Sequence, residues 1–228
     1  AREWGEAQSG WPAAMVEFVI GWHNLHQPRA GRLGVIDAIG QLDGCPLVAS
    51  AVESDVLAAR VERYQPSVLD EVMAEGEFVW MGVESLGPRN GRIRLMSRAT
   101  APVWTGDVTS REQHWVDAGG PHGAIVERLR VERSGFWGLI LGAVADAGAN
   151  DSEVALSALW DLVWDGAVSS DSLTALRACL RGSSPAARGS GRVGARAFRQ
   201  LRSAGPPSAT GRWWLVSSLV EGVGASAT

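Results

Sequence analysis

The stretch that decides the fold reads QPSVLDEVMAEGEFVWMG and spans residues 65–82. Its first half predicts a helix, because Pro66 suits a first helical position and the apolar residues at 68, 69, 72 and 73 share one helical face. Gly76 ends that helix, and the residues after it follow the two-residue period of a strand. A second alternating run covers residues 92–96, and Asn90-Gly91 before it is typical of a hairpin turn. The stretch therefore predicts a helix followed by a two-stranded hairpin.

Three further helices are expected ahead of this stretch. Residues 11–25 are apolar after Trp11-Pro12, residues 33–42 carry apolar side chains at every third position, and another helix begins near Cys45-Pro46 and ends at Arg60. The last two form a trio with the helix after residue 65. Three helices followed by a hairpin is the order of a winged helix, whose third helix commonly enters the major groove of DNA.

A second copy of this order is predicted after a loop over residues 102–120. Helices are expected over 122–130 and 135–147, the latter capped by Ser134, and residues 150–153 offer the N-cap of a third helix that ends at Gly166. A short strand begins at Ala167-Val168 and can pair with a strand over 212–216, which leaves residues 169–211 as a long insertion between two wing strands. The predicted fold class is α+β, mainly α, with tandem winged-helix domains and small β-hairpin wings.

The predicted domain organisation follows from these two copies. We expect a first winged-helix domain over residues 1–104, a linker over 105–120 and a second winged-helix domain over 121–228. The second domain carries an Arg-rich insertion over 182–210. That insertion is expected to be mostly loop, with a short helix over 195–201.

The charges of the chain are divided unevenly. All 21 basic residues are Arg, and 25 acidic residues bring the formal net charge to −4. Residues 1–171 hold 24 acids and 13 arginines, whereas residues 172–228 hold the single acid Glu221 and eight arginines. A basic end on an acidic body prompts a search for nucleic-acid binding. The alternative interpretation is an Arg-rich linker that is merely solvated. In that case Arg replaces Lys because the protein is encoded by a GC-rich genome.

The expected DNA contact lies away from the two third helices. Asp70, Glu71 and Glu75 on the first of them, and the acids at 153, 161 and 165 on the second, would repel phosphates. The first wing, which ends at Arg98, is a more plausible DNA-facing part, although the solvent face of a hairpin commonly carries Arg. The candidate DNA-binding residues come from that wing, the insertion and the last strand: Arg89, Arg92, Arg94, Arg188, Arg192, Arg196, Arg199, Arg202 and Arg212.

The sequence lacks the motifs of a self-contained enzyme. A GxxxxGK[ST] phosphate loop needs the Lys that this chain does not have, and neither GxSxG nor HExxH occurs. Cys45 and Cys179 show no paired spacing, which favours a reducing cytoplasmic setting. His23 and His26 have no third ligand nearby, so no metal is expected, and no apolar run is long enough for a membrane span. No catalytic residue is assigned, and the chain is interpreted as a piece of a longer protein.

Several segments resemble the C-terminal extension of bacterial large helicase-related (Lhr) proteins of actinobacterial type, which are superfamily 2 DNA helicases. The strongest is ALWDLVWDGAV at residues 158–168, followed by SSDSLTALR, which is similar to the family's LWDLVWAGxVTNDTxxPLR. Other matching segments occur in the same order as in the family: VIDAIGQLDG at 35–44, DVLAARV at 55–61, Tyr64, Leu69-Asp70, GEFVW at 76–80, GPRNGRI at 87–93 and GRWWLV at 211–216. The resemblance covers about residues 15–216.

This resemblance implies a protein that couples ATP hydrolysis to 3′-to-5′ movement on single-stranded DNA. ATP and Mg²⁺ would bind in a motor core N-terminal to these residues, so no cofactor is expected within them. The extension is similar to tandem winged-helix DNA glycosylases of the alkylpurine type. The resemblance also implies that some members form homo-oligomers through this extension. The family often has Trp-Gln where this chain has Trp22-His23. The family also has a further C-terminal domain that is expected to lie beyond these residues. For these two reasons, no catalytic residue is carried over.

Three functions remain as hypotheses. The first is a non-motor module of a cytoplasmic DNA repair helicase that contacts single-stranded or forked DNA and lies in one polypeptide with the helicase core. The second is a glycosylase that flips a uracil or alkylated base into a pocket between the winged helices, where a carboxylate stabilises the oxocarbenium charge. The third is a scaffold that holds helicase protomers together, with the 11 Trp residues as candidate interface anchors.

Overall fold

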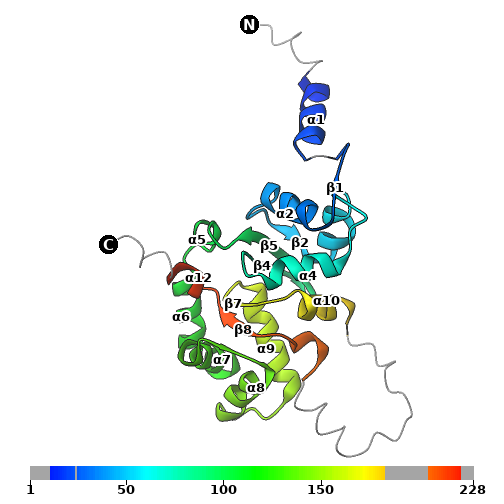
Figure 1. The fold of residues 1–228 in the computed structure, drawn as a ribbon. Helices are drawn as coiled ribbons and strands as arrows, with labels where there is room; N and C mark the ends of the chain where they lie inside the picture. The colour runs from blue at the N-terminus through cyan, green and yellow to red at the C-terminus, as the bar shows by residue number, and fades with distance from the viewer. Residues whose placement is uncertain (1–10, 24, 183–204, 222–228) are drawn as a thin grey trace, which may run out of the picture.

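The computed structural model describes residues 11–23, 25–182 and 205–221 (Figure 1). Its first unit has the helix and strand order of a winged helix, and its sheet order is β2-β5-β4. The second helix of this unit is a short α-helix that continues as a π-helix. The elements of this unit are α2 (Gly31–Gln41), β2 (Leu47–Val48), α3 (Ala49–Ala51), the π-helix η1 (Val52–Leu57), α4 (Pro66–Ala74), β4 (Phe78–Gly87) and β5 (Asn90–Ser97).

The second unit repeats this arrangement. Its sheet order is β6-β8-β7, which places the last strand in the middle as in the first unit. Val168 pairs with Leu215 across β7 and β8, so the predicted pairing of these distant strands is confirmed. The elements of this unit are α7 (Gly120–Glu132), β6 (Ser134–Gly135), α8 (Trp137–Asp146), α9 (Ser152–Trp164), β7 (Val168–Ser170) and β8 (Trp213–Leu215). The predicted fold class, α+β and mainly α with winged helices, is confirmed.

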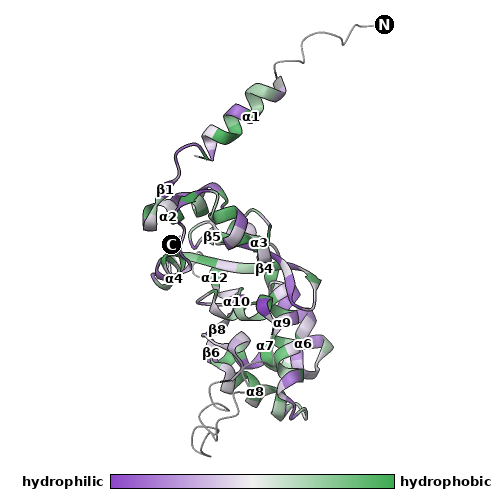
Figure 2. Cartoon of the chain, turned by 90° about the vertical axis from the view of Figure 1, so that its right-hand side faces the viewer, coloured by the Kyte–Doolittle hydropathy of each residue, from purple (hydrophilic) through white to green (hydrophobic). Residues whose placement is uncertain are grey.

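Further short elements surround the two units: α1 (Trp11–Trp22), β1 (Arg29–Ala30), which pairs in parallel with β3 (Val61–Glu62), α10 (Thr174–Arg181), η3 (Pro207–Ala209) and α12 (Ser218–Glu221). Helix α1 stands away from the body in both views of the molecule (Figures 1 and 2). In the described parts of the chain, no helix has the length and apolar character required to cross a membrane.

The predicted loop over residues 102–120 is wrong. It contains α5 (Ala101–Trp104) and α6 (Val108–Ala118), and α6 packs against α7. The side chain of Asp107 caps α6 by accepting a hydrogen bond from the backbone N–H of Ser110, at 3.1 Å. Val108 and Glu112 are the buried residues of this helix, so its sequence has almost no apolar stripe and does not reveal the helix. The expected linker over 105–120 therefore holds a packed helix, while the division at residues 104 and 121 stays a prediction.

Three local predictions also need correction. Gly87 pairs with Asn90, so Pro88 and Arg89 form the hairpin turn and Asn90-Gly91 lie inside β5. Ser134 belongs to β6 and does not cap α8, whose N-cap is Phe136. Leu47-Val48, expected to be helical, form β2 because they pair with Arg92 and Ile93 of β5.

Two further predictions concern the N-cap of α9 and the insertion over residues 182–210. The predicted N-cap of α9 is confirmed, since Asp151 Oδ1 accepts a hydrogen bond from the backbone N–H of Glu153 at 2.8 Å. The predicted insertion over 182–210 is described only at residue 182 and from residue 205. Its expected helix over 195–201 lies outside the described residues.

The wing of the first unit packs against α9 of the second. A side chain at Gly82 would collide with the carbonyl group of Val163, and one at Gly91 would collide with the ring of Trp164. Ser169 Oγ donates a buried hydrogen bond of 2.5 Å to the carbonyl of Trp80. One apolar core runs through both units, and its largest fully buried side chains include Trp80, Ile39 and Leu69 in the first and Leu159 and Trp213 in the second. The two units are therefore joined by a packed interface.

Candidate functional site

The two third helices keep the acidic character of their sequences, and only α9 is largely covered. Helix α9 buries seven of its residues and has the wing β4–β5 packed against it. Helix α4 exposes Glu71 and Glu75, and Glu75 forms an ion pair with Arg32. Neither helix presents a basic face to DNA.

Two of the candidate arginines in the wing are engaged within the protein. Arg94 is half-buried, and its Nη1 donates a hydrogen bond of 2.5 Å to the carbonyl of Trp104, whose ring centroid lies 6.0 Å from the guanidinium carbon. Arg92 is exposed but forms an ion pair with Glu84 across the hairpin. The structure therefore argues against Arg94 as a phosphate contact and gives Arg92 a competing partner.

Arg89 has a different environment at the exposed hairpin turn. Its Nη1 occupies the space that a side chain at Gly182 would need. Gly182 follows Arg181, the exposed basic residue in the last turn of α10, and immediately precedes the residues that include Arg188, Arg192, Arg196, Arg199 and Arg202. Those five candidates lie outside the described residues. Wing and insertion, about 90 residues apart in sequence, thus meet at the end of α10, and we call Arg89, Arg181 and Gly182 the basic corner.

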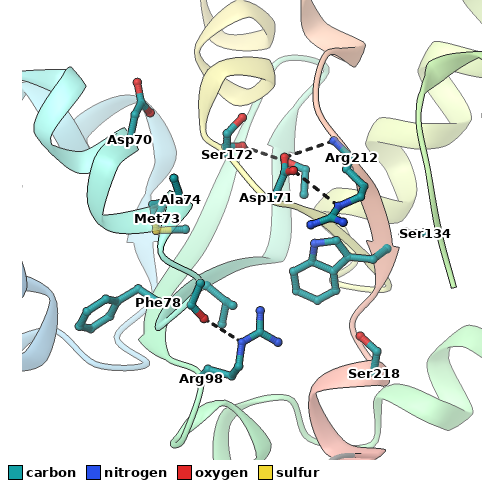
Figure 3. A pocket seen from close by; sticks show the side chains of 14 residues that line it. Asp70, Met73, Ala74, Phe78, Arg98, Ser134, Asp171, Ser172, Arg212 and Ser218 are labelled. Atoms are coloured by element: carbon teal, nitrogen blue, oxygen red, sulfur yellow. Dashed lines mark hydrogen bonds and ion pairs between the residues drawn. The ribbon is translucent and has the colours of Figure 1, made fainter.

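A pocket of about 450 Å³ lies between the two units, and we call it the junction pocket (Figure 3). The first unit contributes residues of α4, the start of β4 and Arg98 after β5, and the second contributes residues of all three of its strands, the β7–α10 loop and α12. The lining side chains that can contact a ligand include Asp70, Phe78, Arg98, Ser134, Asp171, Ser172, Arg212, Trp214 and Ser218. Its volume is in the range of about 300–1,000 Å³ that small-molecule sites occupy.

Two arginines reach the junction pocket from opposite units. Arg212, a candidate from the last strand, has its Nε 3.7 Å from Asp171 Oδ2, and its backbone N–H donates to Asp171 Oδ1 at 3.2 Å. Arg98 Nε donates to the carbonyl of Gly76 at 2.9 Å, and within the described residues no carboxylate lies within ion-pair distance of it. Arg98 therefore keeps donors for an anion, whereas an anion at Arg212 would compete with Asp171.

The glycosylase hypothesis predicts a pocket between the winged helices, but not the residues that line it. Sequence reasoning singled out Arg212 and noted Arg98 as part of the wing, but Asp171, Ser172 and Trp214 were not selected as site residues. These residues come from separate segments, and periodicity does not reveal which segments meet. The available signals were two segments of the resemblance to the Lhr family, 169–177 with Asp171 and Ser172, and 211–216 with Trp214.

Burial perturbs two other titratable groups. Glu112 is 2% exposed, and burial raises the pKa of its carboxyl group, although the backbone N–H of Ser217, which donates to it at 3.0 Å, acts in the opposite direction. Burial raises the pKa of the Cys179 thiol to about 11, so this thiol is not an activated nucleophile. Among the described residues, no cluster of three or more His, Cys, Asp or Glu side chains could hold a metal ion.

Comparison with known proteins agrees with the fold. The winged-helix domain of the large helicase-related proteins matches residues 11–98. A Mycolicibacterium smegmatis protein named "Lhr helicase/ probable uracil glycosylase" is 32% identical over 170 residues, which are 74% of this chain and 11% of that protein. An Escherichia coli protein named "Lhr helicase/uracil glycosylase" is 33% identical over 194 residues, which are 80% of this chain and 12% of that protein.

The matched region is therefore only about a tenth of the length of these relatives. It nevertheless extends over most of this chain, and the matched domain includes the first unit with its wing. The resemblance seen in the sequence is confirmed, and the chain belongs to the large helicase-related (Lhr) family.

Proposed function

We propose that this chain is a non-motor module of a large helicase-related protein that binds the phosphate backbone of DNA. The observation that carries the proposal is the basic corner, where Arg89 and Arg181 flank the start of a segment with five further arginines and no acid. Arginine contacts to phosphates are independent of base sequence and supply most of the affinity of such modules. In the whole protein, a motor core that uses ATP and Mg²⁺ would move the strand that this module holds.

Single-stranded or forked DNA is the proposed partner, because the junction pocket suits an unpaired nucleotide. Arg98 and Arg212 can contact phosphates, and the half-buried Trp214 offers a ring for base stacking. Stacking on aromatic side chains together with a basic path is the usual way in which proteins hold single strands. Neither third helix carries a basic residue with which to contact a duplex at its major groove.

The proposal is tested by reversing the five arginines at 188, 192, 196, 199 and 202 to Glu. Fluorescence anisotropy with a single-stranded oligonucleotide should then show a loss of affinity of at least about 100-fold at low salt, because each phosphate contact is removed and replaced by repulsion. Arg63→Glu is the matched control, since Arg63 is 88% exposed and lies on the loop after β3. Unchanged affinity after the fivefold reversal would show that this segment is not the contact.

A second candidate function is excision of a damaged base in the junction pocket. It is favoured by the names of both relatives, which include a uracil glycosylase, and by the Asp171 carboxylate in a pocket of about 450 Å³. In such a reaction water adds to the sugar carbon as its bond to the base breaks, and the base leaves with a proton. A carboxylate at this position would stabilise the positive charge that develops on the sugar.

Incubation of the 228-residue chain with a uracil-containing oligonucleotide tests this second function. Alkali-labile abasic sites should form with the unaltered chain and disappear with Asp171→Asn. Asp146→Asn is the control, because Asp146 is an exposed carboxylate on α8 that also pairs with an arginine, Arg128. Abasic sites that persist with Asp171→Asn, or that never form, would eliminate Asp171 as the catalytic carboxylate.

A further inference from the structure

Arg177 of α10 makes the most extensive side-chain contact between the two units in the described residues. Its Nε donates to Glu53 Oε1 at 2.6 Å, and its Nη1 donates to both carboxylate oxygens of Asp70 at 2.8 Å each. Its Nη2 also donates to the carbonyl of Pro66 at 3.3 Å. The side chain is only 14% exposed, so this guanidinium is held by the first unit although α10 belongs to the second.

The elements joined by Arg177 are the two walls of the junction pocket. Asp70, Met73 and Ala74 of α4 form the wall from the first unit. The opposite wall includes residues 170–172, the end of β7 and the loop that leads directly into α10. Arg177 lies about one helical turn after that loop. A change in the distance between α10 and α4 must therefore change the width of the pocket.

The electrostatic environment makes this contact selective for arginine. Glu53 lies on the π-helix η1, and its Oε2 also accepts a hydrogen bond of 2.7 Å from the hydroxyl group of Tyr64. Burial raises the pKa of Tyr64, and the hydrogen bond to Glu53 adds to this effect, so the hydroxyl stays protonated as a donor. Burial alone would lower the pKa of Arg177, but its bonds to Asp70 and Glu53 outweigh burial and raise it. A planar guanidinium can serve both carboxylates at once, which an ammonium group cannot do with the same geometry.

We propose that Arg177 is the positioning residue of the junction pocket: it touches no ligand, and it holds α4 and the β7–α10 loop at the separation that an unpaired nucleotide requires. This proposal rests on the proposed function for the identity of the occupant. The positioning itself is a property of the ligand-free protein. It can therefore be tested separately from DNA binding.

The test measures the distance between α4 and α10 in the 228-residue chain without DNA. Nitroxide labels are placed at Glu71→Cys and Thr174→Cys, two exposed positions on these helices, after Cys45→Ser and Cys179→Ala remove the native thiols. Electron paramagnetic resonance then gives the distribution of distances between the labels. Arg177→Gln should broaden this distribution toward longer distances, whereas Arg181→Gln, on the same helix but exposed, should leave it unchanged.

Equal distributions for Arg177→Gln and Arg181→Gln would overturn the proposal. If Arg177→Gln does not fold, Arg177→Lys decides the question, because it keeps the charge but loses the bidentate contact. A distribution for Arg177→Lys as narrow as that of the unaltered chain would then overturn the proposal. Binding of an oligonucleotide is measured on the same variants, so that its absence from the unaltered chain rejects the proposed function and leaves the result for Arg177 in place.

Discussion

Gly82 and Gly91 show at the scale of single residues how the two units are joined. Both are glycines in the wing, and both lie where a side chain would enter α9. The Asn90-Gly91 pair predicts a hairpin turn, because glycine tolerates the backbone of such turns. The structure instead uses Gly91 for close approach to Trp164, a packing role that the sequence of the hairpin alone cannot reveal.

Gly82→Ala should destabilise the protein by about 1–3 kcal/mol, the usual cost of forcing an extra group into a packed interior. The colliding atoms belong to the backbone of α9, so no change of rotamer relieves the overlap. Gly142→Ala is the control, because a Cβ there meets nothing within 4 Å and Ala in a helix interior adds about 0.5–1 kcal/mol of stability. Urea denaturation measures both, and a Gly82→Ala chain as stable as the unaltered one would contradict docking of the wing on α9.

Glu112 should make stability depend on pH. Because its pKa is raised in the folded state, its contribution is fully present below the ordinary pKa of a Glu residue and is lost as the pH rises through the higher folded value. Glu112→Gln keeps a neutral side chain in the same place and should therefore gain stability relative to the unaltered chain between pH 4.5 and pH 7.5. Thermal unfolding at these two pH values checks this. A stability difference that is the same at both would show that Glu112 is not the titrating group.

At the scale of elements, the sequence predicts the helices and strands whose own residues show a helical or an alternating pattern of apolar side chains. Helices α2, α4, α7, α8 and α9 have apolar stripes, and β4 and β5 alternate, so each was expected near its observed position. The two-residue strands β2 and β6 exist because a central strand pairs with them. Helix α6 is mostly polar and exists because α7 packs against it and the backbone N–H of Ser217 bonds its buried Glu112. Those elements depend on tertiary contacts and were missed.

The residues that form the junction pocket were missed for the same reason, because they come from segments that lie far apart in the sequence. Arg177 was part of the segment that resembles the Lhr family, but its partners Glu53 and Asp70 lie more than 100 positions earlier. A single sequence contains no information that pairs these residues. The acids on the two third helices, by contrast, predict from the sequence alone that these helices do not face DNA, and this stays a prediction.

Helix α1 carries a prediction about assembly. Met15, Phe18 and Trp22 are each about 60% exposed on a 12-residue helix that stands away from the body, and an exposed apolar patch of this kind favours association. We predict that the chain forms homo-oligomers and that replacing these three residues by Ser produces monomers. Light scattering at high protein concentration measures this, with Val131→Ser, an exposed apolar residue on α7, as the control. A strict monomer before any substitution would reject the scaffold hypothesis.

At the scale of the whole molecule, the unevenly distributed charges can be assigned to parts of the structure. The acidic body consists of the two units, whose third helices carry no basic residue, while the acid-free arginine segment begins at the basic corner. Because α10 both ends at that corner and carries Arg177, which is bonded to Asp70 in the wall of the junction pocket, one helix connects the two proposed DNA contacts. A DNA strand bound at the basic corner would then lie next to α10, the helix whose position relative to α4 determines the width of the junction pocket.

The salt dependence of oligonucleotide binding tests the central claim most directly. If Arg89, Arg98, Arg181, Arg212 and the five arginines at 188–202 each contact one phosphate, the logarithm of the binding constant should fall against the logarithm of salt concentration with a slope of about −6, from about −0.7 per contact on single strands. Reversal of the five arginines should reduce the magnitude of that slope to about 2.8 or less. A slope that the reversal leaves unchanged would contradict phosphate binding by this segment.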